Sequence, residues 1–242
     1  MSIPELVTIH TSLLTGLGNA VRERFGVSGK MSIEKMTDDV TTLPVLPAPL
    51  VPSGYTQVEY LESSGTQYID TGYTAIDNTR INCVMYMNSD TPQWYAAWGA
   101  TSGGTKMLLL VPKTTASGTT QVYAGSNTYT LSTNPFNTKL RIAIGYNVAY
   151  LELSLIDFNT VSISNKHATQ LTLGLFAGND SGAGGFSPGF LGRIYDFQIF
   201  EDTTEVMHFV PCIRDSDGEA GMYDIIGGQF YTNAGTGTFI TP

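Results

Sequence analysis

The strongest constraint on the fold is a two-residue alternation of apolar side chains that recurs from Gly54 to the C-terminus. In the clearest case, residues 80–87, every second side chain is apolar, and the segments 139–144 and 150–155 repeat the pattern. Such a period places alternate side chains on opposite faces of a β-strand. Because turn signals rather than helical patterns separate the segments, residues 54–242 are predicted to form a two-sheet antiparallel β-sandwich.

Further segments are predicted to be strands. In 193–200 we expect Arg193, Tyr195, Phe197 and Ile199 to share one face of the strand. The remaining candidates are Val58–Glu62, Gln67–Thr71, Trp94–Gly99, Met107–Val111, Gln121–Ala124, Leu171–Ala177, Met222–Ile226 and Phe230–Thr232.

Composition agrees with short strands joined by turns. The chain has 242 residues, of which 42% are hydrophobic, only 14% are charged and 26 are glycine. Twelve Lys and Arg against 21 Asp and Glu give a formal net charge of −9. Nucleic acid is therefore not an expected partner, because phosphate contacts require clustered Lys and Arg, and anionic membrane surfaces are disfavoured for the same reason.

Residues 1–43 carry a helical pattern instead. Apolar residues spaced by three and four positions predict an amphipathic helix from about Pro4 to Phe25, and Ser32 can cap a second short helix that ends near Leu43. Four prolines between residues 44 and 53 predict an extended spacer. The expected organisation is a helical attachment and oligomerisation segment (1–43), a Pro-rich linker (44–53) and a β-sandwich (54–242).

Neither a secretory signal nor a membrane span is expected. Residues 1–5 lack a basic region followed by an apolar stretch, and no run approaches the roughly 18 apolar residues of a span. Two distant cysteines, Cys83 and Cys212, suit neither a zinc site nor a disulfide framework. We expect both to be free and buried, with a single bridge between them as the alternative.

The two ends of the predicted sandwich echo each other. Gly65-Thr66-Gln67-Tyr68 near its start is similar to Gly228-Gln229-Phe230-Tyr231 near its end. If the echo reflects the fold, both strands should occupy similar places on one sheet, with the ends of the domain adjacent. The alternative is a coincidence among strands rich in Gly and Tyr.

Longer stretches at both ends resemble a known family. Residues 54–72 and, near the C-terminus, Gly192–Phe197, Phe209–Cys212, Gly221–Asp224 and Phe230–Phe239 resemble concanavalin A-like (laminin G-like) domains in tail proteins of phages and prophages of Gram-positive bacteria. Residues 13–36 are similar to a short helical module of phage tail and fibre proteins. The resemblance implies a mainly β, antiparallel two-sheet jelly-roll sandwich with a short N-terminal α-helical segment. It also implies a virion protein that is made in the host cytoplasm.

Three functions follow from this resemblance. The first is a tail-fibre or receptor-binding protein whose sandwich recognises a host-surface glycan. The second is a virion-surface decoration or head-fibre knob without a dedicated ligand. The third and least favoured is a glycoside hydrolase, which needs two carboxylates flanking the sugar bond. Related glucanases place closely spaced Glu and Asp on one strand face, whereas Glu152 and Asp157 are five positions apart and would point to opposite faces of an unbroken strand.

The histidines do not change this order, and we expect the protein not to be an enzyme. No motif that names a nucleophile surrounds His10, His167 or His208, so each is expected to be structural or solvated.

The candidate sugar site combines aromatic and polar residues. Lectin sites pair an aromatic platform with amides and carboxylates in loops, which points to Trp94, Tyr95 and Trp98 and to Asn179 and Asp180 in the loop 179–189. Trp94 and Trp98 would share a face if their segment is a strand. The alternative is that both fill the core of the sandwich.

Calcium is the one cofactor considered. Asp215, Asp217 and Glu219 offer three carboxylates around a tight turn that could hold Ca²⁺. The alternative is an ordinary hairpin turn at Asp217-Gly218. Residues 179–182 form a second, equally weak calcium candidate.

The charge of the sandwich restricts its ligand. After residue 50 there are eight Lys and Arg and sixteen Asp and Glu, which leaves a net charge of −8. Such a surface repels teichoic and nucleic acids. A neutral glycan is therefore expected, and binding by several copies would raise its weak single-site affinity.

Assembly is expected to depend on the helical segment. Two short helices cannot cover their own apolar stripe, so we expect self-association, as a homotrimer by analogy with phage fibres, and contacts to other virion proteins through this segment.

Replacing Leu13 and Leu17 together by Asp should therefore dissociate the oligomer and leave the sandwich folded. Light scattering measures the mass of both proteins, and circular dichroism reports the β-structure. A monomeric parent protein, or an intact oligomer of the double variant, would contradict the expectation.

Overall fold

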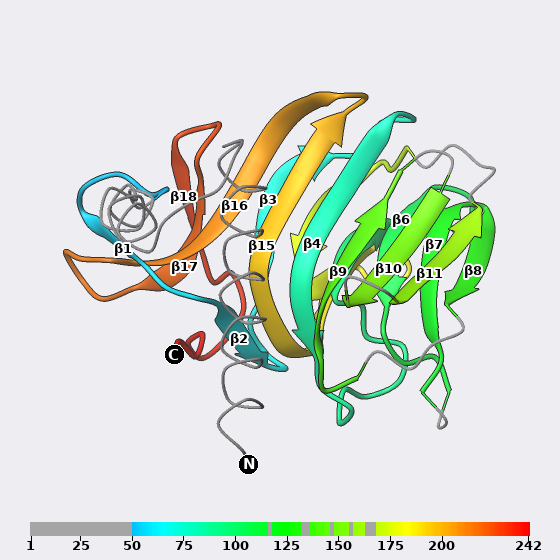
Figure 1. Ribbon diagram of the computed structural model, residues 1–242, viewed down its shortest axis with the longest axis horizontal. Helices are drawn as coiled ribbons and strands as arrows, with labels where there is room; N and C mark the ends of the chain where they lie inside the picture. Colours follow the sequence, from blue (N-terminus) through cyan, green and yellow to red (C-terminus); the bar gives the residue numbers. More distant parts are fainter. Residues whose placement is uncertain (1–49, 116–117, 132–135, 146–147, 155–156, 163–167) are drawn as a thin grey trace, which may run out of the picture. The chain divides into compact units, whose positions relative to one another are not determined.

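The computed structural model describes residues 50–115, 118–131, 136–145, 148–154, 157–162 and 168–242. The chain divides between Ala48 and Pro49 into two compact units, of which the second holds all described residues. The regular structure in the described residues consists of β-strands (Figure 1). The helices predicted for residues 1–43 lie outside the described residues.

The strands form two sheets within the described part of the chain. The larger follows the order β11-β10-β9-β4-β15-β16-β17-β18, with β1 paired to β16 and β2 to β15. Its strands are β1 (Tyr55–Gln57), β2 (Leu61–Ser64), β4 (Thr79–Met87), β9 (Lys139–Ile144), β10 (Val148–Ser154), β11 (Asp157–Ser162), β15 (Leu191–Glu201), β16 (Thr204–Arg214), β17 (Ala220–Asp224) and β18 (Gln229–Thr232).

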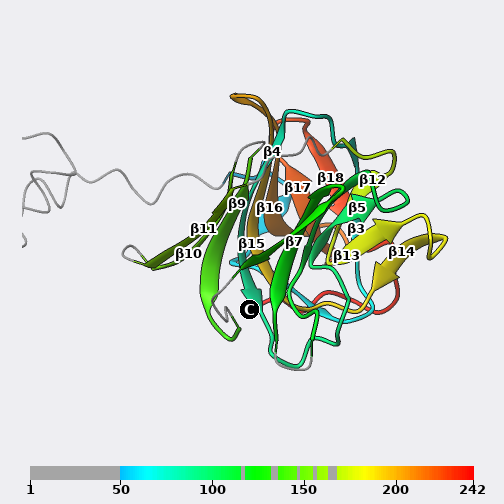
Figure 2. The same cartoon turned by 90° about the vertical axis from the view of Figure 1, so that its right-hand side faces the viewer.

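The smaller sheet follows the order β14-β13-β5-β6-β7-β8, and β12 pairs with both β5 and β3. Its strands are β3 (Ile69–Thr74), β5 (Trp98–Thr101), β6 (Met107–Val111), β7 (Thr120–Gly125), β8 (Asn127–Leu131), β12 (Thr172–Leu175), β13 (Ala177–Asp180) and β14 (Gly185–Pro188). Strand pairs are antiparallel except for β13 beside β5. Figure 2 shows the layer of β4, β9 and β15 beside the layer of β5, β7 and β13.

The inner faces of the two sheets form one hydrophobic core. Strand β4 alternates strictly between buried and half-buried residues, with Ile81, Cys83, Met85 and Met87 buried. The Trp98 ring of the smaller sheet meets the Phe197 ring of the larger one edge to face, at 5.7 Å between centroids. The prediction of a mainly β, two-sheet antiparallel architecture is confirmed, as is the prediction that both cysteines are free and buried.

Strand β15 departs from the predicted alternation. Its buried apolar side chains are those of Ile194, Phe197 and Ile199, and a register shift between Ile194 and Asp196 interrupts its pairing with β4. An extra residue in a β-bulge exchanges the faces of the residues beyond it. The expected common face of Arg193, Tyr195, Phe197 and Ile199 is therefore wrong.

Three further expectations are corrected. The predicted strand 94–99 begins only at Trp98, because Trp94 lies in a turn with φ at 71°. The predicted loop 179–189 instead includes the last two residues of β13 and the whole of its partner β14. None of the predicted strands covers the eleven-residue strand β16, whose Pro211 weakens the strand pattern because proline cannot donate to a ladder.

The echoing ends of the domain lie in different sheets. Strand β3, which follows Gly65–Tyr68, belongs to the smaller sheet, whereas β18 is the edge of the larger sheet. The expectation of one shared sheet is therefore wrong. The ends are nevertheless adjacent: the Ala234 N–H donates to the Tyr68 carbonyl at 2.8 Å, and Glu62 bridges Ile240.

The two tryptophans make a matched pair for testing the core. Trp98→Ala should lower the free energy of unfolding by about 3–5 kcal/mol, because it empties a fully buried site between the sheets. Trp94→Ala should change it by no more than about 0.5 kcal/mol, since the Trp94 side chain is exposed. Urea unfolding followed by far-ultraviolet circular dichroism measures both, and equal losses would contradict the assignment of Trp98 to the core.

Candidate functional site

The structure separates the aromatic residues that sequence analysis grouped. Trp98 is fully buried, whereas Trp94 is 63% exposed and its backbone N–H donates to the Lys113 carbonyl at 2.9 Å. Tyr95 is half-buried and lies so close to Gly189 that a Cβ there would overlap its ring. The expected common face of Trp94 and Trp98 is wrong, and the alternative that both fill the core holds for Trp98 alone.

The polar candidates Asn179 and Asp180 serve local structure. Asn179 is 7% exposed, and its side-chain amide donates to the Thr172 carbonyl at 3.0 Å. The Asp180 carboxylate accepts from the Gly182 N–H at 2.7 Å, at the turn between β13 and β14. These polar atoms hold the hairpin in place, so few remain for a ligand.

The three candidate calcium ligands lie at the hairpin between β16 and β17. The Arg214 guanidinium donates to Asp217 at 2.6 Å, and this bond lowers the pKa of the Asp217 carboxyl. Asp215 accepts from the Thr56 hydroxyl at 2.8 Å, and Gly218 has the positive φ of a turn residue. No group of three or more His, Cys, Asp and Glu side chains in the described residues is placed to hold a metal ion.

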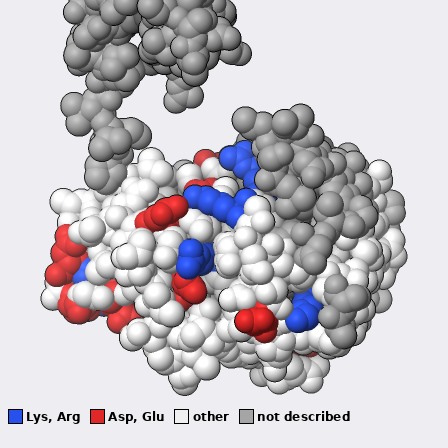
Figure 3. Space-filling view, turned by 60° about the horizontal axis from the view of Figure 1, so that its bottom comes forward, with Lys and Arg blue, Asp and Glu red and all other residues white. Residues whose placement is uncertain are grey.

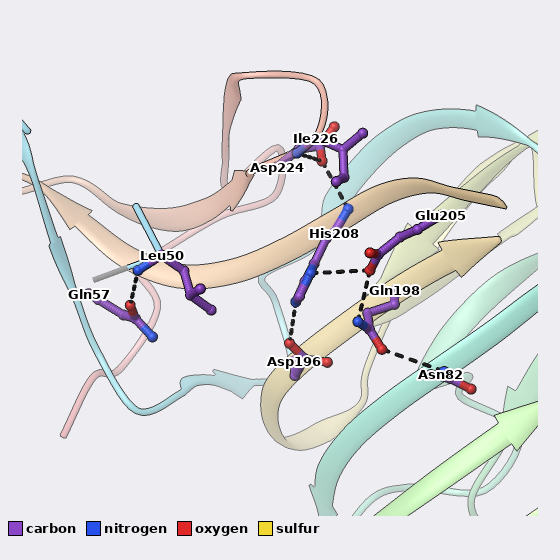
Figure 4. A network of polar contacts seen from close by, with 9 residues as sticks. All are labelled: Leu50, Gln57, Asn82, Asp196, Gln198, Glu205, His208, Asp224 and Ile226. Carbon is purple, nitrogen blue, oxygen red and sulfur yellow. Dashed lines mark hydrogen bonds and ion pairs between the residues drawn. The ribbon is translucent and has the colours of Figure 1, made fainter. Parts of the chain in front are cut away.

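A relay of polar side chains crosses the outer face of the larger sheet (Figure 4). His208 on β16 contacts two carboxylates: Nε2 lies 2.7 Å from Asp196 Oδ1, and Nδ1 lies 3.2 Å from Glu205 Oε1. Gln198 donates to the same Glu205 oxygen at 2.8 Å. The Asp224 carboxylate accepts from the His208 backbone N–H at 2.9 Å. Both ring nitrogens therefore face acceptors, which favours the protonated imidazolium.

The pKa of His208 reflects opposing effects. Burial by itself lowers this pKa, but the hydrogen bond to Asp196 and the charges of Asp196, Glu205 and Asp224 outweigh burial and raise it above the ordinary value of 6.5. The side chain is only 13% exposed. These contacts join β15, β16 and β17, so the relay is a structural element of the larger sheet.

Tyrosines and cations alternate on the same outer face. Arg193 lies over the Tyr60 ring at 4.3 Å and donates to Glu62 at 2.6 Å, while Lys139 lies over the Tyr195 ring at 3.8 Å. Lys139 also pairs with Glu59 at 3.2 Å. Figure 3 shows one face of the sandwich, on which Lys and Arg side chains lie beside Asp and Glu between wide uncharged areas. Because cations already cover the rings and pair with carboxylates, this surface offers a ligand few unused groups.

A cleft with unused groups lies where the edges of the two sheets meet. Its volume is about 500 Å³, and it is lined by Asp70, Thr71, Gly72, Tyr73, Met207, Gln229 and Tyr231. These residues come from β3 of the smaller sheet and from β16 and β18 of the larger one. The volume falls within the range of small-molecule sites.

Contacts with neighbouring residues fix the positions of three side chains that line the cleft, those of Tyr231, Tyr73 and Asp70. The Tyr231 ring packs on Phe209 at 5.2 Å between centroids. The Tyr73 hydroxyl contacts Thr79 at 2.9 Å and donates to Glu201 at 3.2 Å. Asp70 Oδ1 accepts from the Gly72 N–H at 3.0 Å. Gln229 is exposed, and its side-chain amide bonds to no residue that the structure describes.

The two tyrosines of the cleft stay protonated. Burial, partly offset by the hydrogen bond from Thr79 and reinforced by Glu201, raises the pKa of Tyr73 to about 12. Burial first, and then the charges of Asp224 and Asp70, raise the pKa of Tyr231. The cleft therefore presents neutral phenols, one amide and one carboxylate.

Comparisons with known proteins identify no relative. No family model matches the chain, and a search of curated proteins finds no match for it. Within the described residues there is also no helix that is long and apolar enough to cross a membrane.

The cleft is lined by the residue types expected of a sugar site, an aromatic ring with an amide and a carboxylate, but not by the residues predicted from the sequence. In the sequence, Asp70 and Gly72 follow the first copy of the echo, and Gln229 and Tyr231 belong to its second copy. Asp70, Gly72 and Tyr231 also lie in the stretches that carry the family resemblance. Residues so far apart could not be joined without knowing that the ends of the domain lie side by side.

The raised pKa of His208 predicts a pH-dependent stability. Protonation of a group whose folded pKa lies above its unfolded value stabilises the fold; the contribution is complete below about pH 6.5 and is lost as the pH rises through the folded pKa. His208→Gln should therefore cost about 1–3 kcal/mol at pH 6 and less at pH 9. Urea unfolding at both pH values measures this, and a loss independent of pH would contradict it.

Proposed function

We propose that residues 54–242 are a carbohydrate-binding jelly-roll module of the concanavalin A-like kind, which binds a host-surface glycan in the cleft between β3, β16 and β18. The module would belong to a phage tail-fibre or receptor-binding protein, in which residues 1–43 form the helical segment for assembly and attachment to the virion. The resemblance of residues 54–72 and of the C-terminal stretches supports this assignment.

The observation that carries the proposal is the composition of the cleft. Sugars present apolar C–H faces to aromatic rings and hydroxyls to amides and carboxylates, and the cleft provides Tyr231, Gln229 and Asp70 for these contacts. A preformed surface cleft loses little freedom when it binds a ligand. Asp70 and Gln229 are exposed at the surface, where a glycan chain can reach them.

Binding is favoured over hydrolysis by the same lining. The common two-carboxylate mechanism places an acid and a second carboxylate on either side of the glycosidic bond. Asp70 is the single carboxylate among the described residues that line the cleft. The proposed function is therefore recognition, with weak single-site affinity that repeated copies on a virion would strengthen.

The exposed amide of Gln229 offers the cleanest test. Gln229→Ala should weaken binding of the full chain to host cells or to immobilised glycans about five- to tenfold, the effect of losing about one hydrogen bond. Its stability should not change, because the side chain bonds to no described residue.

Gln93→Ala serves as the control, because Gln93 is an exposed amide that does not line the cleft. Binding curves of the labelled parent and both variants are compared. An equal effect of the two substitutions would contradict the cleft as the site, and a parent protein that binds no cell and no glycan would favour the virion-surface knob.

A further inference from the structure

The charges around the cleft are of one sign. Asp70 lines the cleft directly, and Glu201 accepts a hydrogen bond from the Tyr73 hydroxyl. The charge of Asp224 contributes to the raised pKa of the Tyr231 hydroxyl. None of the described residues that line the cleft is Lys, Arg or His. A ligand in the cleft therefore experiences a negative potential that no lining cation offsets.

The nearby carboxylates differ in how much of their hydrogen-bonding capacity is used. Asp224 accepts the backbone N–H groups of His208 and Ile226, and Glu201 accepts the Tyr73 hydroxyl. Asp70 accepts one N–H, from Gly72, through Oδ1, and its side chain is exposed. A carboxylate has about four acceptor positions, so Asp70 can accept further donors from a ligand.

We infer that the cleft prefers a sugar that carries a free amino group, a hexosamine residue, over the same sugar with an acetylated or absent amine. The inference rests on the proposed glycan binding and names its substrate class. The ammonium group would donate to the Asp70 carboxylate, and the ring of the sugar would lie on Tyr231.

The neighbouring aromatic groups suit the same ligand. A cation near the face of a tyrosine ring is attracted by the ring quadrupole, and the Tyr231 ring is held in position by Phe209. Acetylation would remove the positive charge, and with it the electrostatic attraction to the Asp70 carboxylate and to the Tyr231 ring. An anionic sugar would be repelled.

Three tetrasaccharides test the inference on the full-length chain: one of glucosamine, one of N-acetylglucosamine and one of glucose. Isothermal titration at low salt should show the glucosamine oligomer binding about two- to fivefold more tightly than the other two, the size of one exposed ion pair. The preference should shrink at high salt, because salt screens exposed charges.

Asp70→Asn should bring the ratio of the affinities to about one. The substitution keeps an oxygen that can accept the Gly72 N–H, so the turn at β3 can be maintained. Asp90→Asn removes another exposed carboxylate, one that does not line the cleft, and should leave the preference intact.

The outcomes separate the two proposals. Equal binding of the three sugars by the parent protein would overturn the amine preference and leave glycan binding standing. Loss of the preference in Asp90→Asn as well would also overturn it, because the overall negative charge and not the cleft would then attract the amine. If none of the three tetrasaccharides binds, the amine preference is overturned, and glycans of glucose and its amino derivatives are excluded as ligands of the cleft.

Discussion

The burial of two inner sheet faces against each other is the interaction on which the rest of the structure depends. Strand β4 of the larger sheet contributes alternate apolar side chains to this interface, from Ile81 to Met87, and Trp98 and Phe197 meet across it. Apolar burial of this kind is the main favourable term in folding. Because it uses one face of each sheet, it leaves the outer faces and the sheet edges for polar contacts.

The outer face of the larger sheet and its edge have taken different roles. On the outer face, the polar groups of the His208 relay bond to one another, and separate cations lie over the Tyr60 and Tyr195 rings. These contacts stabilise the sheet. At the edge, β18 and β3 belong to different sheets and cannot continue one ladder. Side chains with unused capacity, Asp70 and Gln229, remain there, and this is why the proposed site lies at the edge.

Several elements could be predicted because their determinants are local. The alternation in residues 80–87 marked a half-buried strand, and Asp217-Gly218 marked the turn between β16 and β17. Others depended on contacts that no local pattern records. The bulge after Ile194 places Phe197 and Ile199 on the opposite face from the one predicted. Pro211 weakened the strand pattern of residues 204–214, although they form the long strand β16. Trp94 and Trp98, four positions apart, have opposite environments because Trp94 itself lies in a turn with positive φ, before the strand begins at Trp98.

The mainly β, two-sheet character and the acidic balance of the chain could be predicted from the sequence, because periodicity, charge and residue type are local properties. The sequence left a bridge between the two cysteines open, and the structure has both free and buried. Which strands lie side by side, and therefore which side chains share a cleft, depends on contacts between distant parts of the chain. Asp70, Met207 and Gln229 meet because antiparallel pairing brings the ends of the domain together, as the bridge from Glu62 to Ile240 shows. Such pairing depends on the fit of the whole sandwich, since each strand alone could join several neighbours with a similar gain in free energy.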